Sequence, residues 1–173
     1  MKAIEYLVVH CSATPPSLHN IGAAWIDKIH KEQMGWRKIG YHYVIKRDGK
    51  LEYGRDENEV GAHVKGYNDR SLGICLIGGV DKKNRPANNF TDEQFITLQA
   101  LLNHLSLKYP HAIICGHRDF PDVKKDCPCF DVKSWWTDVN NKEAVKCQDT
   151  KHSLFHYLLQ FLARWKNSIT RSS

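Results

Sequence analysis

A chain of 173 residues, of which 42% are hydrophobic and 25% charged, is long enough for one domain with a substantial buried core. No apolar run approaches the roughly 18 residues of a membrane-spanning helix, which argues against an integral membrane protein. The only apolar run near the N-terminus covers residues 6–9, which is too short for a signal peptide. We therefore expect a protein that is made in the cytoplasm.

The formal net charge of +6 is concentrated at the C-terminal end. Residues 142–173 carry six Lys or Arg and two acidic residues, so residues 1–141 keep a net charge of only +2. No stripe of Lys and Arg alternates with aromatic side chains, and the sequence therefore predicts no nucleic-acid partner. The basic C-terminal segment needs a separate explanation.

The first half of the chain predicts a strand, a helix and a hairpin. Residues 4–10 form a short apolar run that is typical of a buried strand. Residues 21–34 carry apolar side chains at helical spacing, and Gly35 is well placed to end that helix. Residues 41–54 contain two strand-like runs around Asp48-Gly49, which is a strong hairpin signal.

The second half predicts two more strands around a long helix. Residues 72–79 form an apolar run that we expect at the centre of a sheet. Residues 91–94 form a capping-box pattern, which opens an amphipathic helix that ends before Pro110. Residues 111–117 predict another short strand, and Asp131 is placed to cap a short final helix.

Strands that alternate with helices, together with an antiparallel hairpin, predict an α/β fold with a mixed central β-sheet flanked by helices. We assign residues 1–141 to one domain and residues 142–173 to a C-terminal extension. Apolar residues of the extension follow helical spacing with basic residues among them, which predicts an extra basic amphipathic helix. Its role stays open between packing on the domain, contact of residues 150–171 with an anionic membrane, and a dimer contact.

The six cysteines are expected to be reduced in a chain made in the cytoplasm, and they divide into two groups. Cys11, Cys75 and Cys115 lie in or beside apolar runs, where cysteine behaves as a small core residue. Cys127 and Cys129 lie in a polar stretch that contains a proline, where packing explains them less well.

Three residues carry the ligand chemistry of zinc. His10 and His117 each close an apolar strand, at the rim of the sheet where α/β proteins often build sites. With Cys127 they would supply two imidazoles and one thiolate, a known catalytic zinc set that leaves a fourth position for water. We treat Cys129 as a non-ligand because it lies only two residues beyond Cys127. Spacing alone leaves open that both histidines are structural.

The exact residues of several short segments are a more specific signal of a protein family than the spacing of single residues. These segments are V-H-C-S-A-T (9–14), G-Y-H-Y-V-I-K-R-D-G (40–49), V-G-A-H-V-K-G-Y-N (60–68), S-L-G-I-C-L-I-G-G (71–79), G-H-R-D (116–119) and K-x-C-P-x-F-D (125–131). In this order they resemble the zinc N-acetylmuramoyl-L-alanine amidases of the peptidoglycan-recognition-protein type. The resemblance covers about residues 4–140 and implies that residues 1–141 are a zinc amidase catalytic domain.

The resemblance implies a role for five residues. His10, His117 and Cys127 match the three Zn²⁺ ligands of the family. Tyr41 and Lys125 match its catalytic tyrosine and lysine. A lysine near the metal could stabilise the oxyanion of the reaction, and a tyrosine could donate a hydrogen bond to it.

The same motifs suggest residues of a substrate groove. In relatives, histidines at the positions of His42 and His63 line the groove near the metal. For both, the alternative is a histidine that is satisfied by hydrogen bonds inside the domain. Trp36, Lys65 and Asn68 are further candidates for contacts with sugar or peptide.

The function implied by the resemblance is hydrolysis of the amide between N-acetylmuramic acid and L-alanine in peptidoglycan, in a phage or prophage endolysin. All three ligand positions are filled, whereas sensors of this family typically lack the cysteine, so we favour an enzyme. The alternative is a peptidoglycan-binding or RNA-polymerase-binding regulator with secondary amidase activity. An endolysin without a signal peptide would start in the host cytoplasm and reach the cell wall through a holin or another release route.

Overall fold

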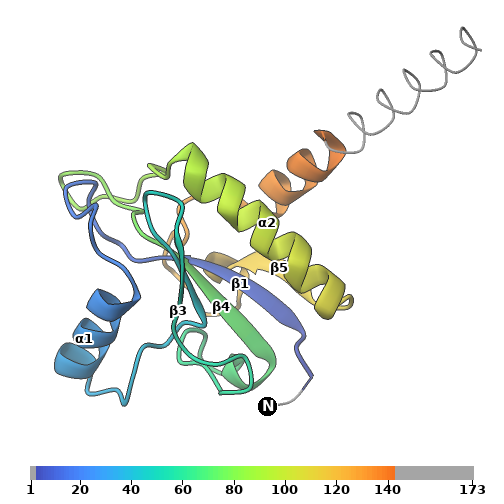
Figure 1. Ribbon diagram of the computed structural model, residues 1–173, viewed down its shortest axis with the longest axis horizontal. Helices are drawn as coiled ribbons and strands as arrows, with labels where there is room; N and C mark the ends of the chain where they lie inside the picture. The colour runs from blue at the N-terminus through green and yellow to red at the C-terminus, as the bar shows by residue number, and fades with distance from the viewer. Residues whose placement is uncertain (1–2, 143–173) are drawn as a thin grey trace, which may run out of the picture. The chain divides into compact units, whose positions relative to one another are not determined.

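The computed structural model describes residues 3–142 (Figure 1). The chain divides into two units, Met1–Trp136 and Thr137–Ser173. The described part of the second unit, residues 137–142, is helical. The expected helical extension, with its candidate membrane contact over residues 150–171, therefore lies outside the described residues except for residue 142.

Within residues 3–142, five strands form one mixed sheet in the order β3-β2-β4-β1-β5. β2 and β3 pair antiparallel, as the hairpin signal predicted, whereas β1 pairs parallel with β4 and with β5. The sheet therefore has the mixed character expected from the sequence, with β4 and β1 at its centre. The strands are β1 (Tyr6–Cys11), β2 (Tyr43–Ile45), β3 (Leu51–Tyr53), β4 (Ser71–Leu76) and β5 (Ile113–Gly116).

Two long helices begin and end where local chemistry predicts. α1 (Ala23–Met34) ends at Gly35, whose φ of 66° is the left-handed conformation that glycine adopts without strain. α2 (Asp92–Lys108) begins with the predicted capping box, in which Thr91 and Gln94 exchange side-chain-to-backbone hydrogen bonds. The side-chain amide of Gln94 also donates hydrogen bonds to the main-chain carbonyl oxygens of Ile45 and Ile77. These bonds attach the start of α2 to the sheet.

The two faces of the sheet are covered by different helices. Side chains alternate along a strand, so Leu7 and Val9 of β1 point to one face and Val8 and His10 to the other. α2 covers the first face and α1 lies on the opposite side (Figure 1). Burial of each leucine of α2 at this contact contributes roughly 1.5–3 kcal/mol. The face beneath α2 is the main core, and on the opposite face smaller apolar clusters surround His10 and its polar neighbours.

Other predictions of the sequence are confirmed at the level of single residues. Cys11, Cys75 and Cys115 are buried free thiols. The Asp131 carboxylate accepts the backbone N–H of Ser134 at 2.9 Å, which caps the helix that starts at residue 132. Within residues 3–142, no helix combines the length and the hydropathy needed to cross a bilayer.

Candidate metal centre

Two parallel neighbouring strands bring the predicted histidines together. His10 lies near the carboxyl end of β1, and His117 begins the short 3-10 helix η2 (His117–Asp119) directly after β5. Because β1 and β5 are paired, both side chains reach the same edge of the sheet, and their ring centroids are 4.5 Å apart.

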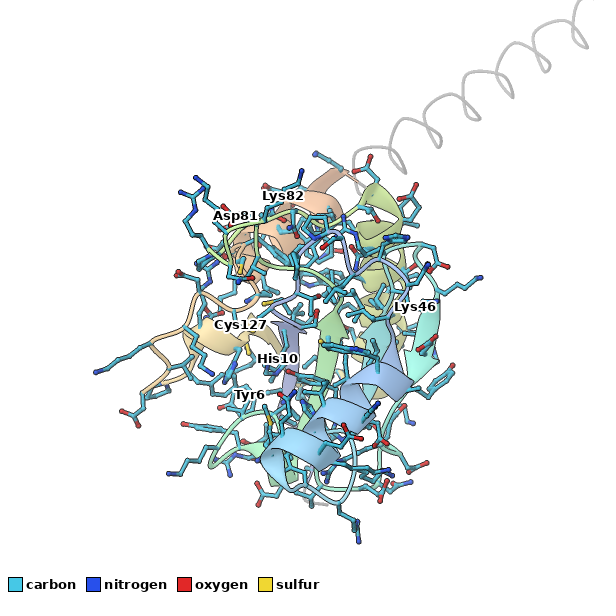
Figure 2. All side chains as sticks on the ribbon, turned by 90° about the vertical axis from the view of Figure 1, so that its left-hand side faces the viewer. Tyr6, His10, Lys46, Asp81, Lys82 and Cys127 are labelled. Atoms are coloured by element: carbon cyan, nitrogen blue, oxygen red, sulfur yellow. The ribbon has the colours of Figure 1, made fainter. Side chains whose placement is uncertain are left out.

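Cys127 joins this pair from the loop that follows η2. The backbone N–H of Arg118 donates to the carbonyl of Cys127 at 2.8 Å and so ties the loop back to η2. The Sγ atom of Cys127 lies 3.8 Å from His10 Nδ1, and it accepts the backbone N–H of Cys11 at 3.3 Å. Figure 2 shows His10 and Cys127 next to each other at this edge.

The donor set and its geometry fit zinc. The ligand atoms of His10, His117 and Cys127 all lie within 4.8 Å of one another, and no other group of three potential ligands meets this criterion among residues 3–142. Bonds of the usual Zn–N and Zn–S lengths in a tetrahedral site separate nitrogen and sulfur ligands by about 3.5 Å. The observed 3.8 Å is close to that separation, so little rearrangement is needed to hold an ion.

The electrostatics of the site keep both imidazoles neutral, which is the form that binds a metal. Burial, followed by the nearby His63 and His117, lowers the pKa of His10 well below its usual value. Burial, followed by the positive charge of Lys125, lowers the pKa of His117. A lone pair for a metal is therefore present on each ring at neutral pH.

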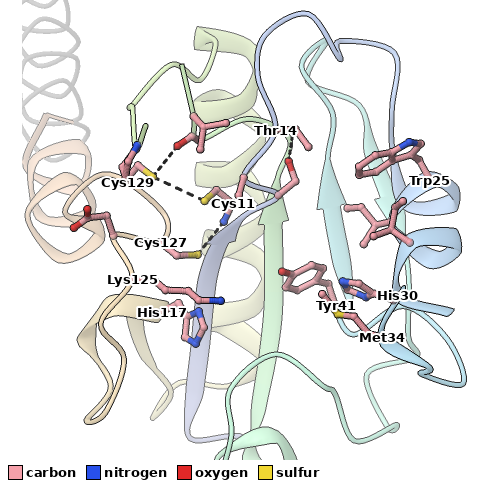
Figure 3. A pocket seen from close by; sticks show the side chains of 18 of the residues that line it. Cys11, Thr14, Trp25, His30, Met34, Tyr41, His117, Lys125, Cys127 and Cys129 are labelled. Atoms are coloured by element: carbon pink, nitrogen blue, oxygen red, sulfur yellow. Dashed lines mark hydrogen bonds between the residues drawn. The ribbon is translucent and has the colours of Figure 1, made fainter. Parts of the chain in front are cut away.

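A pocket of about 560 Å³ opens beside the three candidate ligands (Figure 3). Lys124 and Lys125 are among its lining residues, and Lys125 lies next to His117 (Figure 3). Residues of α1 form the opposite wall. These wall residues are Trp25, Ile26, Ile29, His30 and Met34.

Tyr41 lies in the pocket between the metal site and α1. Its ring centroid is 5.1 Å from that of His10 and 5.6 Å from that of His30. The segment before it is held by α1, because His30 Nδ1 accepts the N–H of Gly40 and Asp27 accepts the N–H of Ile39. Burial raises the pKa of Tyr41 well above its usual value, so the hydroxyl stays protonated and can donate a hydrogen bond.

The structure corrects the expectation that His42 lines the groove. His42 is fully buried, its Nδ1 accepts the N–H of Gly73 at 2.9 Å, and its Nε2 donates to the Glu59 carbonyl at 3.0 Å. Both ring nitrogens are satisfied inside the domain, which is the alternative that the sequence left open. His63 lies between His42 and His10, behind the metal site, and it contacts His10 directly.

The remaining groove candidates do not line this pocket either. Trp36 packs against His30 with ring centroids 4.6 Å apart. Lys65 is exposed, and the Asn68 side chain is used to accept the N–H groups of His63 and Val64. Their expected contacts with sugar or peptide stay predictions.

The sequence missed the α1 wall of the pocket. Its residues follow helical spacing, which predicts only that one face of the helix is buried. His30 is the clearest omission, because it contacts Tyr41 and lines the pocket. Cys129, as expected, stays apart from the ligands: its Sγ donates to the Gly79 carbonyl at 3.0 Å and lies 3.9 Å from Cys11 Sγ.

The fold and the site define an α/β protein with a candidate catalytic metal centre at one edge of a mixed sheet. Residues 1–130 match the N-acetylmuramoyl-L-alanine amidase family, Amidase_2, and the chain belongs to this family. The predicted fold class and family are thereby confirmed.

Relatives and solved structures agree with this assignment. The endolysin of Enterobacteria phage T3 is 50% identical over 132 residues, which are 76% of this chain and 85% of the relative. The endolysin of Escherichia phage T7 is 48% identical over 135 residues, or 78% and 87% of the two chains. Among solved structures, the N-acetylmuramoyl-L-alanine amidase LysC from Clostridium intestinale has a TM-score of 0.66 at 32% identity and covers 79% of this chain and 85% of its own. Drosophila PGRP-LB has a TM-score of 0.60 at 27% identity, covering 74% and 76%.

Proposed function

We propose that this chain is a phage endolysin that hydrolyses the amide between N-acetylmuramic acid and L-alanine in peptidoglycan, with Zn²⁺ held by His10, His117 and Cys127. The observation that carries the proposal is the set of three ligand atoms within 4.8 Å of one another beside an open pocket. Membership of the amidase family and the high identity to phage endolysins support the substrate and the bond.

Each side chain of the site has a task in this reaction. Zinc, when bound, lowers the pKa of a water molecule to about 7 and polarises the amide carbonyl. The Lys125 ammonium lies at the rim beside His117, where it can stabilise the negative charge that develops on the carbonyl oxygen. The protonated Tyr41 hydroxyl can donate a hydrogen bond to the same oxygen, and side chains of α1 line the far side of the pocket.

The products of digestion test the proposed bond. Purified sacculi treated with the protein should release free amino groups of L-alanine without new reducing sugar ends. A chelator should abolish this activity and added Zn²⁺ should restore it. New reducing ends would refute the amidase assignment, and activity that resists complete metal removal would refute the zinc assignment.

Replacing Tyr41 with phenylalanine tests its role as a donor. We expect kcat to fall by about 10²–10³-fold, the usual loss for one donor to a developing oxyanion, with KM changed much less. The measurement is steady-state release of amino groups from soluble peptidoglycan fragments. Tyr53→Phe, on an exposed tyrosine of β3, is the matched control and should behave like the wild type. An unchanged kcat in the Tyr41 variant would remove the hydroxyl from the mechanism.

The other expectations of the sequence stay predictions. No described contact bears on an RNA-polymerase-binding role, and the candidate membrane contact lies beyond the part of the chain that the structure describes. Release through a holin is likewise a sequence-based expectation.

A further inference from the structure

His10 has a polar partner on the side away from the pocket. Its Nε2 atom lies 3.1 Å from Nδ1 of His63, and the two rings meet edge to face with centroids 5.1 Å apart. On its other side, His63 Nε2 lies 3.4 Å from the Ser71 hydroxyl oxygen. The Ser71 hydroxyl in turn donates to the main-chain carbonyl of Tyr67 at 2.8 Å. Four groups thus form a continuous chain of hydrogen bonds that ends at a candidate metal ligand.

The main-chain carbonyl determines the direction of every bond in this chain. A carbonyl oxygen can only accept, so the single proton of the Ser71 hydroxyl points to Tyr67. The Ser71 oxygen must then accept from His63, which places the proton of His63 on Nε2 and leaves Nδ1 as an acceptor. His10 must therefore donate from Nε2, and the lone pair of its ring lies on Nδ1, the atom 3.8 Å from Cys127 Sγ.

The space around His63 is shaped for an imidazole. A Cβ atom placed on Gly73 would lie 2.7 Å from the His63 ring, and one placed on Gly61 would lie 2.5 Å from it. Both positions must stay without a side chain for the ring to fit between them. The Asn68 carboxamide accepts the N–H groups of His63 and Val64 at 2.8 Å each, which holds the backbone that carries the ring.

We propose that His63 is a positioning residue that holds His10 in the tautomer and orientation required for zinc. It accepts the Nε2 proton of His10 and so directs the Nδ1 lone pair towards Cys127 and His117. This inference rests on the proposed zinc site. Partners of this kind stabilise a metal-binding histidine in one orientation, and their loss typically weakens metal affinity or activity by about 10–100-fold.

Three substitutions separate hydrogen bonding from packing. His63→Leu removes every polar atom of the ring. His63→Asn places an amide group where Nδ1 lies, whereas His63→Gln places it closer to the position of Nε2 and away from His10. We expect the dissociation constant for Zn²⁺, measured by competition with a chromophoric chelator, to rise about 10–100-fold in the Leu and Gln variants. The Asn variant should stay within about threefold of the wild type, because it keeps an acceptor for His10.

The visible absorption spectrum of the Co²⁺-substituted protein supplies a second readout. It reports the geometry of the ligands, so the Leu and Gln variants should show an altered spectrum and the Asn variant the wild-type one. His104→Asn, on the exposed surface of α2, is the matched control and should change neither measurement. Thermal unfolding of the metal-free proteins shows whether each variant is folded.

Two outcomes would overturn the proposal. Wild-type affinity for Zn²⁺ in both the Leu and Gln variants would show that the contact with His10 has no role in metal binding. Equal weakening in the Asn and Gln variants would show that only the shape of the ring matters. If Cys127→Ala binds Zn²⁺ as tightly as the wild type, the proposed zinc site itself is wrong. This experiment uses no His63 variant, so failure of the zinc site can be told apart from failure of the role proposed for His63.

Discussion

Replacing Cys127 with alanine should remove bound zinc and lower amidase activity by at least about a thousandfold. The metal supplies several kcal/mol of transition-state stabilisation, and about 4 kcal/mol corresponds to a thousandfold change in rate. Cys127 contributes the only sulfur of the candidate ligand set, and its Sγ faces His10 Nδ1 at 3.8 Å. Metal content by elemental analysis and release of amino groups from sacculi measure the two effects.

Cys129→Ala is the matched control for this variant. The Cys129 thiol lies two residues beyond Cys127 in the same loop. It donates to the Gly79 carbonyl and is not a member of the candidate ligand set. We expect the Cys129 variant to keep its zinc and most of its activity. Cys127→Asp should restore part of the metal content, because a carboxylate oxygen can also bind zinc. A Cys127→Ala protein with full activity would contradict the proposed centre.

Replacing Lys125 with methionine should lower kcat by about 10²–10³-fold, the loss expected when one group that stabilises a developing oxyanion is removed. Methionine keeps an unbranched side chain of similar length and removes the ammonium with its charge and its N–H donors. Lys125 lies beside His117 and is close enough for its charge to help lower the pKa of that histidine. Because the substrate amide is neutral before the reaction, the charge should matter more for kcat than for KM.

Lys124→Met provides a control with the same change of charge. Both lysines are exposed and both line the pocket, but only Lys125 influences the pKa of His117. Steady-state kinetics at several salt concentrations should therefore show a large loss of kcat in the Lys125 variant and a small, salt-dependent change of KM in the Lys124 variant. Equal losses of kcat in both variants would indicate a general effect of positive charge on binding to the cell wall.

Local chemistry determined the elements of this fold. The short apolar run of residues 4–10, the Asp48-Gly49 turn, Gly35 and the Thr91 capping box each act within a few residues, so they can be read from the sequence. The resemblance of short motifs also indicated His10, His117 and Cys127, which the structure brings together. Spacing could not have shown this, because over 100 residues separate the first ligand from the others.

Only the tertiary structure decided what the neighbouring histidines do. His42 and His63 lie in motifs of equal strength, yet one is satisfied in the core and the other contacts a candidate ligand 53 residues away. The α1 wall of the pocket likewise depends on how a helix packs beside Tyr41. Local sequence determines the strands and helices because their hydrogen bonds and turns involve near neighbours. The partners of a buried polar side chain come from distant segments, and the parallel order of β1, β4 and β5 brings those segments together.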